Sequence, residues 1–103
     1  MQEEILTETL RIETNFPDFM SFYNESEETI YRKILEIFED LKTSNKDQKQ
    51  LIIIANIDGF VFDTIFYILK DNHQLITDVI RPYFERMEDY ETCEKIVKIC
   101  KQP

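Results

Sequence analysis

The chain has 103 residues, of which 43% are hydrophobic and 13% aromatic, and its formal net charge is −9. We expect one folded domain over residues 1–103, because this apolar content excludes an intrinsically disordered chain, which combines high net charge with few large hydrophobic residues. The negative charge disfavours direct binding to nucleic acid or to an anionic membrane, since both depend on Lys and Arg.

The longest apolar run, residues 51–55, is far shorter than the roughly 18 to 20 residues that span a bilayer, so we expect no membrane attachment. The first residues are acidic and lack the basic start and apolar run of a signal peptide, which predicts a cytoplasmic protein. Cys93 and Cys100 lie about 10 Å apart on one expected helix, beyond the ~7 Å limit for a disulfide, and are expected to be reduced.

Weak helix signals precede Asn24. Two apolar stripes at helical spacing predict two short helices there, and Pro17 is tolerated in the first turn of the second. The stripes consist of Ile5, Leu6 and Leu10, and of Phe16, Phe19, Met20 and Tyr23.

A clearer helix follows from Thr29, with Asn24 or Ser26 as its cap. Its apolar residues recur at the spacing of a helix with one buried face. They are Ile30, Ile34, Ile37 and Leu41, flanked by Tyr31, Leu35 and Phe38. The polar residues 42–50 then resemble a linker in composition.

Two structures compete for residues 50–72. Asp58-Gly59 between two apolar runs is a strong hairpin signal, and the hairpin would place Phe60, Phe62 and Phe66 on one largely apolar face. Alternatively, a helix ends at Gly59 and the next begins at once. We favour the helix-turn-helix and keep the hairpin as the alternative.

The last third predicts more helices. An apolar stripe over residues 75–87 is interrupted by Pro82, which predicts a kink or a new helix near this proline. A final helix starts near Asp89, its expected cap, and carries Cys93, Ile96 and Cys100 on one side. The predicted fold is therefore an all-α compact bundle of about five to six short helices, with an α+β fold containing one β-hairpin around Asp58-Gly59 as the alternative.

Few residues suggest catalysis or metal binding. His73, the single histidine, lies in a polar junction and is expected to be a turn or capping residue, and a Cys-His pair has no support from spacing. Glu36, Glu39 and Asp40 fall on the outside of a helical stripe, which is typical of a solvated face. No metal-binding or phosphate-binding motif is visible, so we expect no enzyme and no cofactor.

Acidic residues are concentrated at the amino-terminal end. Residues 1–31 contain eight acidic residues and Arg11 as their one base, a net charge of −7. Within them, residues 15–28 (NFPDFMSFYNESEE) mix aromatic and acidic side chains. The stripe of Phe16, Phe19, Met20 and Tyr23 is interpreted either as core or as part of an interface with aromatic anchors and an acidic rim.

Our leading hypothesis is a small, acidic, non-enzymatic protein-binding domain that occupies a basic surface of another protein, such as a nucleic-acid-handling protein. Immunity proteins, phage-encoded inhibitors and DNA mimics act in this way, and the comparison rests on composition alone. The alternatives are a helical adaptor or homo-oligomer that associates through an apolar face, and an enzyme built around His73. The expected partner-binding residues are Asp18, Phe22, Tyr23, Glu25, Glu27 and Glu28.

Overall fold

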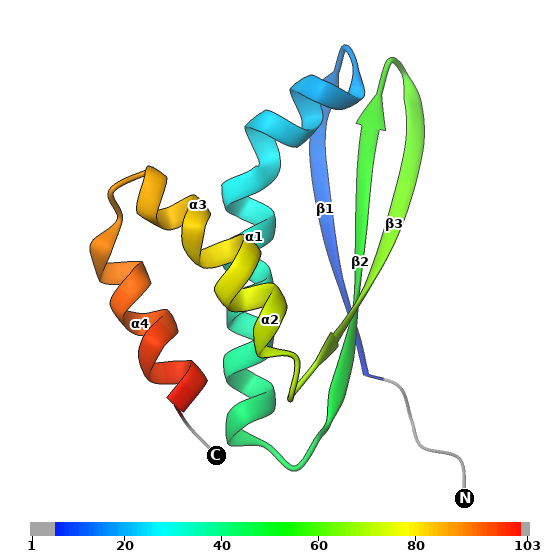
Figure 1. Ribbon diagram of the computed structural model, residues 1–103. Helices are drawn as coiled ribbons and strands as arrows, with labels where there is room; N and C mark the ends of the chain where they lie inside the picture. Colours follow the sequence, from blue (N-terminus) through cyan, green and yellow to red (C-terminus); the bar gives the residue numbers. More distant parts are fainter. Residues whose placement is uncertain (1–5, 102–103) are drawn as a thin grey trace, which may run out of the picture.

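The computed structural model describes residues 6–101 and shows an α+β fold, in which helices pack beside a three-stranded mixed sheet (Figure 1). The expected all-α helical bundle is therefore wrong. The elements in chain order are β1 (Thr7–Phe16), α1 (Phe19–Thr43), β2 (Gln48–Ile57), β3 (Phe60–Leu69), α2 (His73–Leu75), the π-helical turn η1 (Ile76–Ile80), α3 (Arg81–Arg86) and α4 (Tyr90–Lys101).

The sheet has the order β1-β2-β3, with β1 parallel to β2 and β3 antiparallel to β2. The short helix expected around Leu10 is instead strand β1, and Ile5, the first residue of that stripe, lies outside the described residues. Side chains of β1 alternate, since Leu10 and Ile12 pack against the core while Thr9 and Arg11 are exposed. Alternation with a period of two is typical of a strand. In so short a segment the same apolar residues also fit helical spacing, so the pattern alone does not distinguish the two structures.

Asp58 and Gly59 form the two-residue turn of a β-hairpin, so the favoured helix-turn-helix is also wrong. Both residues have positive φ, at 51° and 80°, which is the backbone of a type I′ turn. The β-branched run before the turn favours a strand, and its alternate residues are fully buried. They are Leu51, Ile53, Ala55 and Ile57, each at most 3% exposed.

Helix α1 begins at Phe19, earlier than expected, because Asp18 caps it by accepting a hydrogen bond from the Ser21 N–H (2.7 Å). It continues to Thr43, so the expected linker is reduced to the turn between α1 and β2. The stripe that predicted the helix forms the centre of the core. Its fully buried members are Ile34, Ile37, Phe38 and Leu41.

The carboxy-terminal helices match expectation more closely. Pro82 lies in the first turn of α3, directly after the π-helical turn, so the predicted break in the helix is confirmed. Asp89 accepts a hydrogen bond from the Thr92 N–H (3.1 Å) at the start of α4, which confirms the predicted cap. Both Cys93 and Cys100 are free, as expected.

Helix α1 packs on one face of the sheet and contacts α4 on its other side (Figure 1). Among residues 6–101, no helix covers the opposite face of the sheet, and Ile52 and Ile54 of the central strand are only half-buried there. Within residues 6–101, no helix has the length and hydropathy needed to cross a bilayer.

Candidate functional site

One end of the molecule is formed by two chain segments without any Lys or Arg. Residues 12–31 and 50–69 contain no basic residue. The fold joins the two segments at the turn between β2 and β3, because the Asp58 N–H donates to the Phe16 carbonyl (2.7 Å) and the Gly59 N–H to Asn15 Oδ1 (3.0 Å). The acidic residues of the two segments are Glu13, Asp18, Glu25, Glu27, Glu28, Asp58 and Asp63.

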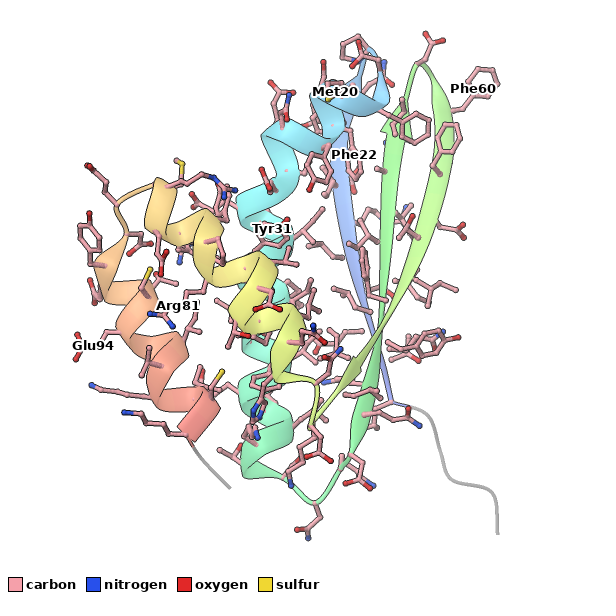
Figure 2. All side chains as sticks on the ribbon, viewed as in Figure 1. Met20, Phe22, Tyr31, Phe60, Arg81 and Glu94 are labelled. Carbon is pink, nitrogen blue, oxygen red and sulfur yellow. The ribbon has the colours of Figure 1, made fainter. Side chains whose placement is uncertain are left out.

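Aromatic side chains are exposed at this same end. Phe19 at the start of α1 contacts Phe62 of β3 edge-to-face, with ring centroids 4.9 Å apart, although Phe19 remains 57% exposed. Met20 is 69% exposed and Phe60 66%, and both lie at this end of the molecule (Figure 2). We define the acidic aromatic tip as Phe19, Met20, Tyr23, Phe60 and Phe62 together with the acids Asp18, Glu25, Glu27 and Asp58.

The structure separates the aromatic residues of residues 15–28. Phe16 is buried at the end of β1, and Phe22 turns toward it, with ring centroids 5.5 Å apart. Phe19 and Met20 are exposed, so the predicted stripe of Phe16, Phe19, Met20 and Tyr23 is not buried as one helical face. Tyr23 is 52% exposed, and its hydroxyl lies 3.4 Å from that of Tyr31.

The expected acidic residues lie on different sides of α1. Asp18 caps the helix, and this hydrogen bond from the Ser21 N–H lowers its pKa. Glu25 is exposed and lines a small hollow beside β1, whereas Glu27 is half-buried near Tyr31. Glu28 points toward α4 and pairs with Arg32 (3.1 Å). Tyr23 and Asp18 therefore lie at the tip, while Phe22 and Glu28 face other parts of the fold.

Burial also perturbs Tyr31, the neighbour of Tyr23. Desolvation raises the pKa of the Tyr31 phenol above its ordinary value, and the hydrogen bond to Tyr23 and the nearby Glu27 carboxylate raise it further. Tyr83 packs edge-to-face on Tyr31 with ring centroids 5.3 Å apart. Burial likewise raises the pKa of Tyr83. The phenols of Tyr31 and Tyr83 are therefore neutral near pH 7, so the negative charge near them comes from carboxylates.

Away from the tip, several carboxylates are neutralised inside the fold. Glu8 lies 2.7 Å from Lys33 Nζ and 2.8 Å from Lys49 Nζ, and these bonds lower its pKa. Among residues 6–101, the tip acids Asp18, Glu25, Glu27 and Asp58 form no ion pair. The tip carboxylates thus keep their negative charge uncompensated, whereas carboxylates such as Glu8 are neutralised by nearby lysines.

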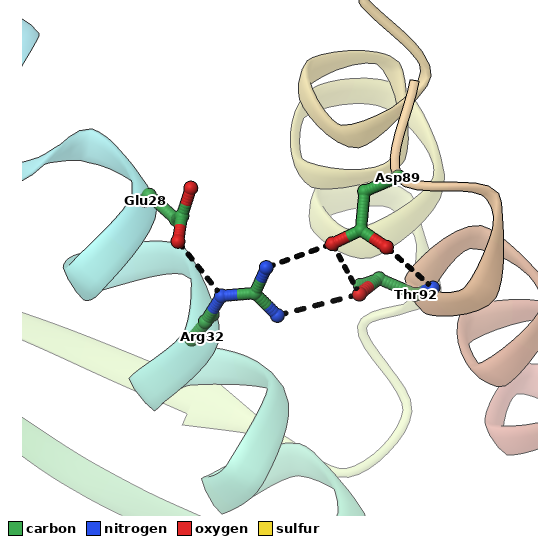
Figure 3. Close-up of polar contacts among 4 residues, drawn as sticks. All are labelled: Glu28, Arg32, Asp89 and Thr92. Atoms are coloured by element: carbon green, nitrogen blue, oxygen red, sulfur yellow. Dashed lines mark hydrogen bonds and ion pairs between the residues drawn. The ribbon is translucent and has the colours of Figure 1, made fainter. Parts of the chain in front are cut away.

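Arg32 connects α1 to the start of α4 (Figure 3). Its guanidinium donates to Glu28 Oε2 (3.1 Å), Asp89 Oδ2 (2.7 Å) and Thr92 Oγ1 (3.3 Å). The same group lies over the Phe84 ring, 4.8 Å from its centroid. Two carboxylates raise the pKa of Arg32, and Thr92 and Arg32 lower the pKa of Asp89.

A groove of about 860 Å³ runs between α1 and α4, beside this network. Its charged residues pair with one another, as Lys95 does with Glu39 (3.3 Å) and Lys98 with Glu94 (3.3 Å). Of these two pairs, only Lys95–Glu39 crosses the groove, so it links α4 to α1, whereas Lys98–Glu94 lies within α4.

The residues considered for catalysis, His73, Cys93 and Cys100, have contacts and burial typical of structural residues. His73 is half-buried against the Phe38 ring, and its Nε2 lies 2.7 Å from Lys42 Nζ. Burial raises the pKa of Cys93 and Cys100, which keeps both thiols protonated. The described residues contain no group of three or more His, Cys, Asp or Glu side chains able to hold a metal ion.

Sequence reasoning did not place Phe60 and Phe62 in the candidate site. Their signal was the hairpin alternative at Asp58-Gly59, which puts both rings on one face next to the start of α1. The favoured helix-turn-helix did not bring Phe60 and Phe62 next to the start of α1, so they were not predicted as site residues. Comparisons with known proteins add no further information, because no family model, no curated protein and no solved structure matches this chain.

Proposed function

We propose that this chain is a non-enzymatic, cytoplasmic protein-binding domain that uses the acidic aromatic tip to bind a basic surface of another protein. The observation that carries the proposal is the coincidence of exposed rings and unpaired carboxylates at an end formed by two cation-free segments. Interfaces combine these features, since aromatic anchors supply contact energy and rim charges guide the encounter.

Charge makes a basic partner the natural complement of the tip. Potentials of one sign over a surface raise the association rate of an oppositely charged partner and repel partners of like charge. Proteins that handle nucleic acids carry large basic surfaces for phosphate binding. A domain bound there would compete with the nucleic acid, so the proposed action is that of an inhibitor, immunity protein or DNA mimic.

The experiment is affinity capture from a host lysate at low salt with the wild type and three variants. The tip variant replaces Glu25→Gln, Glu27→Gln and Asp58→Asn, none of which forms an ion pair within residues 6–101. The matched control removes the same charge elsewhere through Asp40→Asn, Asp71→Asn and Glu91→Gln, all exposed.

A specific partner is expected to bind the wild type and the control variant equally and to be lost with the tip variant. A second tip variant, Phe19→Ser with Met20→Ser, keeps the charge and is expected to lose the same partner. Equal capture by all four proteins would contradict the proposal, as would retention of only nonspecific proteins.

A further inference from the structure

Strand β3 is exposed along almost its whole length. Nine of its ten residues are exposed, and only Ile68 is buried. Eight of the ten are apolar or aromatic, and Asp63 is the single charged residue within the strand. Free strand edges usually carry charged residues, proline or a bulge that prevents pairing with another chain, and β3 has little of this protection.

The backbone of β3 is ready to accept another strand. The Lys70 N–H donates to the Asp47 carbonyl (2.8 Å). Because hydrogen-bonded pairs alternate along an antiparallel ladder, the backbone N–H and C=O groups of the even-numbered β3 residues bond to β2. The N–H and C=O groups of Val61, Asp63 and Ile65 therefore point away from β2. The sheet ends at β3, so these groups lie along its free edge.

The apolar surface of β3 is large for a chain of this size. Seven of its side chains are between 37% and 70% exposed, namely Phe60, Val61, Phe62, Ile65, Phe66, Tyr67 and Leu69. Because large side chains present roughly 150 to 250 Å² when fully exposed, the strand leaves on the order of 600 Å² uncovered. Pairing at the strand edge covers only the part of this area that faces the added strand, so the contact depends on the backbone ladder and on cross-strand side-chain pairs as well as on apolar burial.

We propose that β3 pairs antiparallel with β3 of a second copy of this chain, around a two-fold axis through Thr64. This inference goes beyond the proposed function and does not depend on it. In this register Phe62 faces Phe66 of the second copy, and Val61 faces Tyr67. These are the aromatic and aromatic–β-branched cross-strand pairs that stabilise antiparallel sheets.

Electrostatic interactions favour the register centred on Thr64 over the one centred on Asp63. Centring the pair on Thr64 sets Asp63 opposite Ile65 of the second copy and brings the turn residue Asp58 beside Lys70. Lys70 forms no ion pair among the described residues, so it is free to pair with this carboxylate. A pair centred on Asp63 would place two carboxylates directly opposite each other, which is destabilising.

The proposed dimer contains one continuous six-stranded sheet. Since the two copies of β3 run in opposite directions, the two Asp58-Gly59 turns and the two starts of α1 lie at opposite ends of the dimer, whereas Phe62 lies close to the two-fold axis and is covered by the second copy. The carboxylates of Asp18 and Asp58 are thus kept apart, and the start of α1 remains accessible on each copy. A dimer of this form presents two equivalent binding surfaces to basic partners.

The first experiment measures self-association by sedimentation velocity over a concentration series. The wild type is expected to form a species of twice the 12.5 kDa chain mass. Ile65→Asp places a carboxylate opposite Asp63 of the second copy, whereas Ile65→Lys places an ammonium there. We expect Ile65→Asp to dimerise at least about 10-fold more weakly than Ile65→Lys, because a two-fold axis repeats each pair twice.

Thr9→Asp adds the same charge on β1, the other edge of the sheet, and is expected to leave the dimer intact. Circular dichroism on each variant verifies that it is folded. The proposal is overturned if the wild type is monomeric at every concentration, if Ile65→Asp dimerises as well as the wild type, or if the two Ile65 variants weaken dimerisation equally.

The second experiment tests the register by cysteine cross-linking under mild oxidation. Thr64→Cys places two thiols at the two-fold axis, where facing Cα atoms are about 4.5 to 5.5 Å apart and within disulfide reach. Val61→Cys is the matched control, since its counterpart lies about 20 Å further along the strand. Covalent dimer is expected with Thr64→Cys alone, and equal yields from the two variants, or none from Thr64→Cys, would rule out this register.

Discussion

Individual ion pairs explain why some of the many carboxylates contribute to folding while others remain available. Glu8 on β1 lies between Lys33 of α1 and Lys49 of β2, so it ties three elements together. Arg32 does the same for α1 and α4 through Glu28 and Asp89. The pairs of Glu8 with Lys33 and Lys49 and of Arg32 with Asp89 cannot be read from the sequence, since the partners are tens of residues apart, whereas the local Asp89 cap was predictable.

Replacing Glu8→Gln is expected to reduce the free energy of unfolding by about 1 kcal/mol at pH 7, a value typical of a partly exposed ion pair. The pKa of Glu8 is lowered in the folded state, so its stabilisation is present at neutral pH and is lost as the pH falls through that lowered pKa. Urea unfolding of both proteins should give curves that converge in acid, below the lowered pKa of Glu8. A difference that persisted into strong acid would rule out an electrostatic role.

Replacing Arg32→Gln is expected to lower the urea midpoint, because the change removes three hydrogen bonds and the cation over the Phe84 ring. Arg86→Gln is the matched control, since Arg86 is exposed and forms no ion pair within residues 6–101. Equal midpoints for the two variants would show that Arg32 does not stabilise the contact between α1 and α4.

Secondary-structure elements differ in how well local sequence determines them. The long apolar stripe of α1 and the capped helix α4 were predictable, because a helical period sustained over several turns has few alternatives. The region around Asp58-Gly59 was ambiguous, since a short apolar run fits a strand or a helix and the dipeptide suits either a hairpin turn or a helix end. Strand β1 was missed because its pairing partner, β2, is more than thirty residues away.

Substituting Gly59→Ala should destabilise the hairpin by roughly 1 kcal/mol, because an L-residue pays a backbone penalty in the left-handed region. Gly59 has φ of 80°, and an added Cβ would meet no atom within 4 Å, so the cost arises from the backbone alone. Asp58→Asn is the control and should be neutral, since Asn is favoured at this turn position. Thermal unfolding measures both, and equal loss in the two variants would contradict the turn assignment.

At the scale of the whole molecule, the fold brings together what the sequence keeps apart. The cation-free residues 12–31 and 50–69 meet at one end, so acids from α1 and from the β2–β3 turn share one region. Sequence reasoning recognised the acidic and aromatic character of residues 15–28. It could not find Phe60 and Phe62, because their place beside Phe19 depends on the hairpin, nor foresee that Phe22 faces Phe16.

Whole-molecule electrostatics also limits where a partner can approach. Several carboxylates near α4 and the middle of α1, namely Glu28, Glu39, Asp89 and Glu94, are paired with bases, so less of the negative charge there is left uncompensated. Long-range steering of this kind changes association more than dissociation and weakens as salt screens the charges.

The most direct test of the central claim is the association rate of the captured partner measured against ionic strength. For the wild type the rate should fall steeply with added salt. The variant carrying Glu25→Gln, Glu27→Gln and Asp58→Asn should associate about 10-fold more slowly at low salt and depend less on it. Identical rates and identical salt dependence for the two proteins would contradict binding through the acidic aromatic tip.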